Sequence, residues 1–231
     1  MIPLKDTVQA RSFPLVNWIL IGVNIFVFLF EVRLGSDAEA FIAALGVVPA
    51  RILAAPSLGQ VLTIFTSMFL HGGWLHLLSN MLALYIFGDN VEDRVGHGRY
   101  LVFYLICGLI AALTHIAFNS NSPVPTIGAS GAISGVLGAY FILYPRARVI
   151  TLIPIFILPW FIEIPAIVYL GFWFLSQLLN GTLAIVSGAQ AFGGVAFWAH
   201  VGGFLAGLLL VKPFEQRRYV RRVYVDEYWP W

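Results

Sequence analysis

The sequence predicts an all-α, polytopic membrane protein, a bundle of six transmembrane helices with a long interfacial first loop. Two observations support this prediction. Of the 231 residues, 60% are hydrophobic and only 10% are charged, whereas about 25% of the residues in a typical soluble domain are charged. The apolar residues also gather in long runs, and a helix of about 20 apolar residues crosses the hydrocarbon core of a bilayer.

Six apolar runs are predicted to span the membrane. The first is long enough to act as an anchor rather than as a cleaved leader. A further apolar stretch, Leu58–Leu70, is too short to span and is interrupted by His-Gly-Gly at 71–73, so we expect it to be an interfacial or re-entrant part of the first loop. The predicted spans are Leu15–Arg33, Trp74–Phe87, Tyr100–Phe118, Gly128–Tyr144, approximately Pro159–Leu179, and Val195–Val211.

The segment 149–181 is long enough for two spans and contains three prolines. The basic residues decide between one span and two, because Lys and Arg concentrate on the cytoplasmic side of membrane proteins. With one span, 11 of the 13 basic residues and both termini lie in the cytoplasm, whereas a second span would place the basic tail outside. The 11 residues are Lys5, Arg11, Arg94, Arg99, Arg146, Arg148, Lys212, Arg217, Arg218, Arg221 and Arg222.

The chain is therefore divided into a cytoplasmic N-terminal segment at 1–14, a six-helix membrane domain at 15–211 and a basic cytoplasmic tail at 212–231. We expect a multi-pass protein of the cell membrane, either plasma or inner. The tail is rich in Arg and aromatic residues, which act as topology signals and interfacial anchors; binding to anionic lipid is the alternative. A single cysteine, Cys107, excludes an internal disulfide.

Polar side chains at membrane depth are costly and often functional. Three groups stand out: His71, His76 and Asn80 at the start of the second span, Ser130 at the start of the fourth, and His200 near the start of the sixth. These three spans run in the same direction, so they begin on the same, outer side of the membrane. His76 and Asn80 are four residues apart and share one helical face. We expect these side chains to meet just below the outer surface.

Small residues recur at every fourth position on the fourth and sixth spans, a spacing that lets helix backbones approach closely in lipid. Such an approach would bring the starts of the two spans together. The residues are Gly131, Gly135 and Ala139, and Ala199, Gly203 and Gly207.

Ser130 and His200 form a candidate catalytic dyad. A serine hydroxyl is a weak nucleophile until a base removes its proton, which requires an imidazole nitrogen within about 2.6–3.2 Å. No carboxylate completes a triad, because Glu163, the one placed well inside a span, lies on another helix. For a developing oxyanion, the start of the fourth span offers backbone N–H groups and a favourable dipole, and His76 and Asn80 can donate from the side.

Gly128 lies two residues before Ser130, and its lack of a side chain lets a substrate backbone come close to the serine. The segment differs from the G-x-S-x-G elbow of soluble hydrolases, because the second residue after Ser130 is alanine. A competing interpretation is a three-histidine metal site made of His71, His76 and His200, although the first two lack the H-E-x-x-H spacing. Otherwise no metal or cofactor is expected.

Three segments resemble the signature motifs of the rhomboid family of intramembrane serine proteases. They are residues 71–81 (HGGWLHLLSNM), 128–132 (GASGA) and 199–204 (AHVGGF). Their order, their spacing and their places at the starts of the second, fourth and sixth spans match the family, and the resemblance extends from about residue 12 to residue 213. Glu92 and Arg94 also resemble its cytoplasmic loop motif.

The resemblance implies the six-helix rhomboid core in its basic prokaryotic form, and a protease that cuts single-pass membrane proteins within or just outside the membrane. It implies Ser130 as the nucleophile and His200 as the base. It also implies an oxyanion hole made of His76, Asn80 and the Ser130 amide, with the two auxiliary residues His71 and Gly128 nearby.

A transmembrane helix hides its carbonyls in its own hydrogen bonds, whereas a protease needs an extended strand. The expected partners are therefore transmembrane protein substrates with Gly, Pro or polar residues near the outer helix end, together with membrane lipids and no nucleic acid. The family also favours small residues just before the cut. An inactive relative that binds membrane clients and a small transporter remain alternatives, and the oligomeric state stays open.

Overall fold

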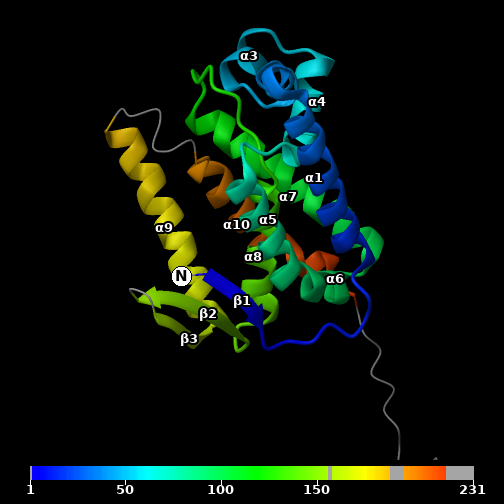
Figure 1. Cartoon of the computed structure of the whole chain (residues 1–231), viewed down its shortest axis with the longest axis vertical. Coiled ribbons are helices and arrows are strands. Elements are labelled where there is room, and N and C mark those ends of the chain that lie inside the picture. The colour runs from blue at the N-terminus through cyan, green and yellow to red at the C-terminus, as the bar shows by residue number, and fades with distance from the viewer. Residues whose placement is uncertain (1, 156–157, 188–194, 217–231) are drawn as a thin grey trace, which may run out of the picture.

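The structure, a computed structural model, describes residues 2–155, 158–187 and 195–216. Most of these residues lie in helices, and three helices pack together at the centre of the bundle (Figure 1). The central helices are α7 (His97–Phe118), α8 (Ser130–Leu143) and α10 (Phe197–Phe214). Around them lie α1 (Leu15–Leu34), α5 (Trp74–Ala83) and α9 (Ala166–Val186). This mostly helical bundle confirms the predicted fold class.

The other helical elements are short. α5 continues through the π-helical turn η3 (Leu84–Gly88) into α6 (Asp89–Val95), so the second predicted span, Trp74–Phe87, extends further than predicted. The first, third, fourth and sixth predicted spans agree with α1, α7, α8 and α10 to within three residues at each end. The first loop contains the 3-10 turn η1 (Gly35–Asp37), α2 (Ala38–Leu45), α3 (Pro49–Ala54), α4 (Leu58–Thr66) and the 3-10 turn η2 (Ser67–Phe69).

Apolar helices show that the chain is embedded in a membrane. Within the described ranges, four helical stretches are long and apolar enough to span: Leu15–Leu45, His97–Phe118, Ala166–Val186 and Phe197–Phe214. The pair Leu58–Phe69 and Trp74–Val95, bent by 81°, makes a fifth if it counts as one broken span. α8 is apolar but has 14 residues, fewer than the ~20 of a usual span. The count of six spans therefore stays a prediction.

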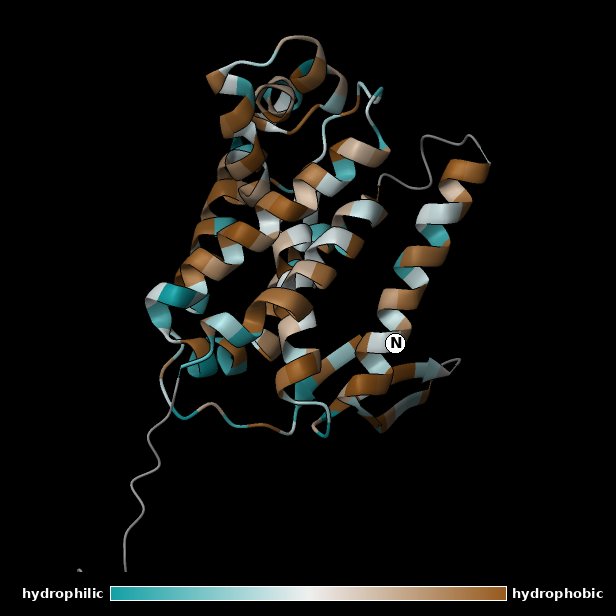
Figure 2. Ribbon diagram, turned by 180° about the vertical axis from the view of Figure 1, so that it is seen from behind, coloured by the Kyte–Doolittle hydropathy of each residue, from teal (hydrophilic) through white to brown (hydrophobic). Residues whose placement is uncertain are grey.

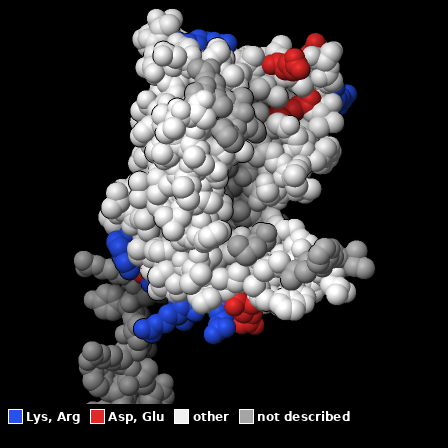
Figure 3. Space-filling view, turned by 90° about the vertical axis from the view of Figure 1, so that its left-hand side faces the viewer, with Lys and Arg blue, Asp and Glu red and all other residues white. Residues whose placement is uncertain are grey.

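The outer surface agrees with a lipid environment. Apolar residues recur along the length of the helices (Figure 2), and large hydrophobic side chains such as Phe26 and Leu209 are more than 70% exposed. On the face shown in Figure 3, charged side chains lie toward the two ends and leave an uncharged band between them. The basic tail from Arg217 onward lies outside the described residues.

Glycines bring α8 and α10 into backbone contact. A Cβ atom added to Gly203 would lie 2.0 Å from the carbonyl oxygen of Gly131, and one added to Gly207 would lie 1.9 Å from that of Gly135. No side chain fits at such distances, so these glycines set the spacing of the two helices. The small residues at every fourth position act here as predicted, and the helix starts that carry Ser130 and the 197–200 turn lie close together.

A three-stranded antiparallel sheet, which the sequence analysis did not predict, lies at the end of the bundle opposite the first loop (Figure 1). Its strand order is β1 (Ile2–Asp6), β2 (Arg148–Ile155), β3 (Leu158–Pro165). In the β1–β2 pair, Ile2 lies opposite Leu152. Part of the predicted N-terminal segment is therefore paired with the hairpin that precedes α9.

The sheet corrects the predicted fifth span, Pro159–Leu179. Residues up to Pro165 belong to β3, and the helix begins at Ala166 and ends at Val186. β-branched residues are frequent in 149–155 and 162–164, and they favour extended backbone. Pro154 lies opposite Pro159 at the turn end of the hairpin, where a missing N–H disturbs the ladder least. The described part of 149–181 holds one helix, in agreement with the choice of a single span.

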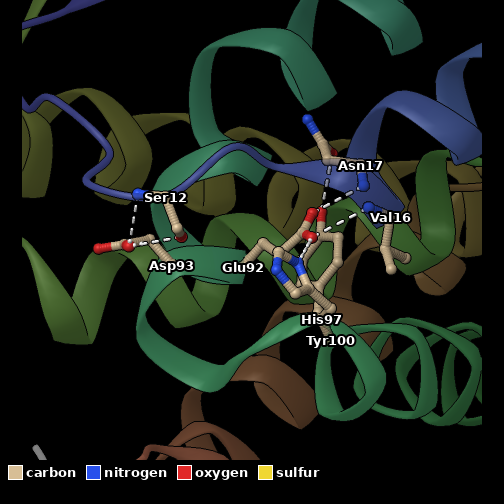
Figure 4. A network of polar contacts seen from close by, with 7 residues as sticks. All are labelled: Ser12, Val16, Asn17, Glu92, Asp93, His97 and Tyr100. Atoms are coloured by element: carbon tan, nitrogen blue, oxygen red, sulfur yellow. Dashed lines mark hydrogen bonds and ion pairs between the residues drawn. The ribbon is translucent and has the colours of Figure 1, made fainter.

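Glu92 explains why α1 begins where it does (Figure 4). The first turn of α1 has no acidic residue of its own, but the Glu92 carboxylate accepts hydrogen bonds from the backbone N–H groups of Val16 at 2.9 Å and Asn17 at 2.7 Å. These groups lack partners within the helix. His97 also contacts the Glu92 carboxylate, and Tyr100 donates to the Asn17 side chain at 2.9 Å. This network joins α1, α6 and α7 at the end of the bundle that holds the sheet.

Candidate active site

Ser130 and His200 are in contact. Ser130 is the first residue of α8, and His200 lies in the first turn of α10. The Ser130 Oγ atom lies 2.9 Å from Nε2 of His200, which is within the range for proton transfer from a hydroxyl to an imidazole base. Both side chains are half-buried, so the pair is sheltered and still reachable.

Gln177 on α9 is a third member of this group that the sequence analysis missed. Its Oε1 atom lies 2.9 Å from Nδ1 of His200, and the residue is only 8% exposed. The sequence does contain a signal for Gln177, because an amide within the apolar run of α9 is a polar group at membrane depth. The sequence does not reveal that its partner is His200, because this contact depends on how α9 packs against α10.

Gly128 makes room for His76 beside Ser130. Gly128 has φ +122°, and a Cβ atom built on it would lie 2.7 Å from Nε2 of His76 and 3.6 Å from Oγ of Ser130. The backbone N–H of Gly72 donates to Nδ1 of His76 at 3.3 Å. Nδ1 is therefore an acceptor, and in the neutral ring the proton lies on Nε2, on the side that faces Gly128.

Asn80 brings a buried donor without an acceptor. The residue is 6% exposed, and among the described residues its Nδ2 atom has no hydrogen-bond partner. An unsatisfied buried donor costs about 1–3 kcal/mol, and such groups call for an explanation such as a catalytic role. The backbone N–H of Ser130 lies in the first turn of α8, where amides have no partner within the helix. His76 and Asn80 on α5 and the backbone of Ser130 at the start of α8 thus each carry an N–H donor.

The loop before α8 is fixed on two sides. The backbone N–H of Gly128 donates to the carbonyl of Ser67 at 2.8 Å, and Thr126 exchanges two backbone hydrogen bonds with Val47 at 2.7 and 3.0 Å. Nε2 of His115 lies 2.8 Å from the Thr126 hydroxyl. The first loop and α7 therefore hold the segment that presents Ser130.

His71 is placed next to this group. It is 1% exposed, and its ring centroid lies 5.0 Å from that of His76. Its backbone N–H donates to the carboxylate of Glu31 on α1, 3.3 Å from each oxygen. Among the described residues, neither ring nitrogen of His71 has a hydrogen-bond partner. Glu31 therefore positions the chain just before α5.

The structure changes the interpretation of Glu163 and bears on the three-histidine metal site. The sequence predicts Glu163 well inside a span, but the residue lies on β3, where it is exposed and 3.7 Å from Arg148. Buried carboxylates lie on helices instead: Glu31 on α1 is 3% exposed, and Glu92 on α6 is fully buried. For the three-histidine alternative, the described residues include no group of three or more His, Cys, Asp or Glu side chains arranged to hold a metal ion.

A small cavity adjoins Ser130. It has a volume of about 30 Å³ and is lined in part by Gly128, Ser130, Ala132 and Ala199. A water molecule needs about 10–15 Å³ of such space. The space beside Ser130 is therefore small, with room for only a few atoms.

Fold and site together define a membrane-embedded helical protein in which a serine and a histidine meet across two helices. The chain belongs to the rhomboid family, because the family model described as Rhomboid domain matches residues 58–216, more than half of its length.

Several curated proteins are similar to this chain. Rhomboid protease GluP of Bacillus subtilis (strain 168) is 36% identical over 127 residues, which cover 54% of this chain and 24% of GluP. RHOMBOID-like protein 5 of Arabidopsis thaliana is 31% identical over 175 residues, 72% of this chain and 49% of that protein. Rhomboid protein 1, mitochondrial, of Saccharomyces cerevisiae is 28% identical over 165 residues, which cover 68% of this chain and 44% of that protein. The matched region thus spans about a quarter to a half of these relatives.

Proposed function

We propose that this chain is an intramembrane serine endopeptidase that cleaves single-pass transmembrane proteins near the outer membrane face by a Ser–His dyad. The observation that carries the proposal is the 2.9 Å contact between Ser130 Oγ and His200 Nε2, made by residues from α8 and α10. Membership of the rhomboid family and the printed name of its relative GluP, a rhomboid protease, support it.

The reaction proceeds in two halves. Nε2 of His200 takes the hydroxyl proton while Oγ of Ser130 bonds to the scissile carbonyl carbon, whose oxygen becomes an oxyanion. The N–H groups of Ser130, His76 and Asn80 stabilise that charge. The C–N bond then breaks, and the imidazolium gives its proton to the leaving amine. Water attacks the acyl-enzyme with His200 again as base, which releases the acid and restores the hydroxyl.

The substrate must present an extended backbone to Ser130. A stable transmembrane helix satisfies its own carbonyls and N–H groups, so cleavage favours substrates with Gly, Pro or polar residues near the outer helix end. The cavity of about 30 Å³ beside Ser130 supports a small side chain just before the cut. The enzyme lies in the cell membrane with both termini in the cytoplasm, surrounded by lipid.

The test is cleavage in liposomes by the purified full chain, with a single-pass model substrate that carries Gly-Pro near its outer helix end. We expect the wild type and the control Ser187→Ala, at an exposed serine at the end of α9, to cut it. Ser130→Ala and His200→Ala should not cut it, and a fluorophosphonate should label wild type but not Ser130→Ala. Replacing Gly-Pro with helix-forming residues should suppress cleavage.

Cleavage that survives both Ser130→Ala and His200→Ala would rule out the dyad. A wild type that captures the substrate without cutting it would support the client-binding alternative.

A further inference from the structure

Gln177 accepts a hydrogen bond on the side of His200 that faces away from Ser130. We propose that Gln177 is the positioning residue of the dyad, and that its amide oxygen holds the imidazole in the tautomer and orientation in which Nε2 takes the Ser130 proton. This inference rests on the proposed protease function and adds a third residue to it. It places that residue on α9, outside the three segments in which the sequence motifs lie.

The neighbours of the Gln177 amide determine which of its ends faces His200. The Nε2 atom lies 3.0 Å from the Ser176 hydroxyl and 3.3 Å from the carbonyl oxygen of Trp173. A carbonyl oxygen can only accept, so the NH₂ group must point toward it. The Ser176 hydroxyl donates to the same carbonyl at 2.6 Å, which leaves its lone pairs free to accept from Gln177. Oε1 is therefore the end that faces His200.

The amide orientation in turn fixes the tautomer of His200. Since Oε1 of Gln177 can only accept, Nδ1 of His200, 2.9 Å away, must carry the proton. A neutral imidazole has one N–H, so Nε2 keeps its lone pair. That lone pair lies 2.9 Å from the Ser130 hydroxyl. With the other tautomer, Nε2 would be protonated and could not act as the base.

Gln177 also restricts rotation of the ring. The χ2 torsion of histidine is broad, so packing and hydrogen bonds must fix the plane of the imidazole. The Trp173 ring, one turn before Gln177, lies 5.7 Å from the His200 ring with planes tilted by 36°. α9 thus contributes both an aromatic ring contact, from Trp173, and a hydrogen-bond acceptor, from Gln177, to the imidazole of His200.

A neutral amide suits this depth in the membrane. Burying an unpaired carboxylate in an apolar environment is far more costly than burying an amide with its hydrogen bonds satisfied. Gln177 supplies the acceptor that a triad carboxylate would supply, without bringing a charge into the span. This explains how a Ser–His pair can be oriented although, among the described residues, no carboxylate contacts His200.

Three variants test the proposal in the full chain in liposomes. Gln177→Leu keeps the approximate size but removes the acceptor. Gln177→Glu restores an acceptor at the same reach. Asn180→Leu, on the exposed side of α9, is the matched control for losing one polar group from this helix. Wild type and Ser130→Ala are measured alongside, so that a failure of the proposed function is recognised separately.

For Gln177→Leu we expect kcat to fall about 10- to 100-fold, part of the ~10²–10⁴ that a positioned base contributes. KM should stay within about twofold, because the residue acts on the base and does not bind the substrate. Gln177→Glu should recover part of the lost rate, because a carboxyl oxygen still accepts from Nδ1 although burial disfavours its charged form, and Asn180→Leu should match wild type. A merely structural role would not produce this separation of kcat from KM or the recovery by Glu.

The second readout does not depend on activity. In protein labelled with ¹⁵N-histidine, the His200 signals are assigned by their loss in His200→Ala, and their shifts report which ring nitrogen carries the proton. We expect protonated Nδ1 and unprotonated Nε2 in wild type, and more of the other tautomer in Gln177→Leu.

Three results would overturn the role of Gln177: an unchanged kcat in Gln177→Leu, an equal loss in Gln177→Leu and Gln177→Glu, or a wild-type His200 protonated on Nε2. If wild type cleaves nothing, the protease proposal fails, while the nitrogen shifts still decide whether Gln177 fixes the tautomer.

Discussion

Gly128 shows how little free space surrounds Ser130. Its backbone lies in the left-handed half of conformational space, and the position where a Cβ would sit is already bordered by the ring of His76. Two separate physical requirements, backbone conformation and space, therefore exclude any larger residue. The same glycine allows the ring of His76 and the hydroxyl of Ser130 to lie on one side of the loop.

The effects of backbone conformation and of limited space can be separated by comparing Gly128 with Gly35. Gly35 also has positive φ, +56°, but nothing lies within 4 Å of an added Cβ. Gly128→Ala and Gly35→Ala should both lose the ~1–3 kcal/mol of an unfavourable backbone conformation. Only Gly128→Ala should lower kcat, by about 10²-fold or more, because it displaces one oxyanion donor. Thermal unfolding in detergent and liposome cleavage measure both effects, and full activity in Gly128→Ala would contradict the role given to His76.

Asn80 offers a test in which stability and activity change in opposite directions. Asn80→Leu removes a buried donor that has no partner among the described residues, so the free energy of unfolding should stay the same or rise. The same change should lower kcat by about 10²–10³, as for loss of one oxyanion donor. Ser79→Ala, at an exposed neighbouring position, should alter neither. A parallel loss of stability and rate in Asn80→Leu would mean that Asn80 has a structural role.

Helices α8 and α10 were more predictable than α9. Their small residues recur at fixed spacing, which indicates that the two backbones approach closely; in the structure Gly203 lies against Gly131. The segment before α9 is apolar except for a few residues such as Thr151 and Glu163, so it has no clear period that separates a strand from a helix. Gln177 was missed for a related reason, because its partner is set by packing between α9 and α10 rather than by any local pattern.

α9 is also less embedded in the bundle than α10. α9 lies at the edge of the bundle (Figure 1). In the most apolar 18-residue stretch of each helix, 22% is buried in α9 and 50% in α10. This partly exposed helix nevertheless contacts His200 through Gln177. The orientation of His200 thus depends on how firmly α9 is held.

The end of α10 is fastened to α6 by Glu215, which forms ion pairs with Arg94 and with Lys212. The hydrogen bond from Arg94 holds the pKa of Glu215 below its ordinary value of 4.5. A carboxylate with a lowered folded-state pKa adds stability above its unfolded pKa and loses it as the pH falls through the folded pKa. We therefore expect Glu215→Gln to be less stable than wild type near neutral pH, with the gap closing below about pH 4.5.

Thermal unfolding of both proteins across that range measures the gap. A difference between wild type and Glu215→Gln that is the same in acid as at neutral pH would show that the ion pairs do not cause it.

The whole chain is expected to cross the membrane six times with both termini inside, a topology that its basic residues predict. Impermeant thiol reagents can test this in Cys107→Ser by adding single cysteines at Ser36, Asn121, Gly98 and Ser12. Ser36 and Asn121 should react from outside in intact cells, whereas Gly98 and Ser12 should react only after permeabilisation. Outside labelling at Ser12 would reverse the orientation, and outside labelling at Gly98 would change the count of spans.

The pairing of β1 with β2 has a consequence for how the protein is made. Ile2 lies opposite Leu152, so Ile2–Asp6 must wait for its partner until a stretch ending near residue 155 has left the ribosome. At about 5–20 residues per second, that interval is on the order of ten seconds, during which α1 and α7 can already enter the bilayer. The strand that comes early in translation therefore docks late, and the sheet closes only after much of the bundle has been inserted.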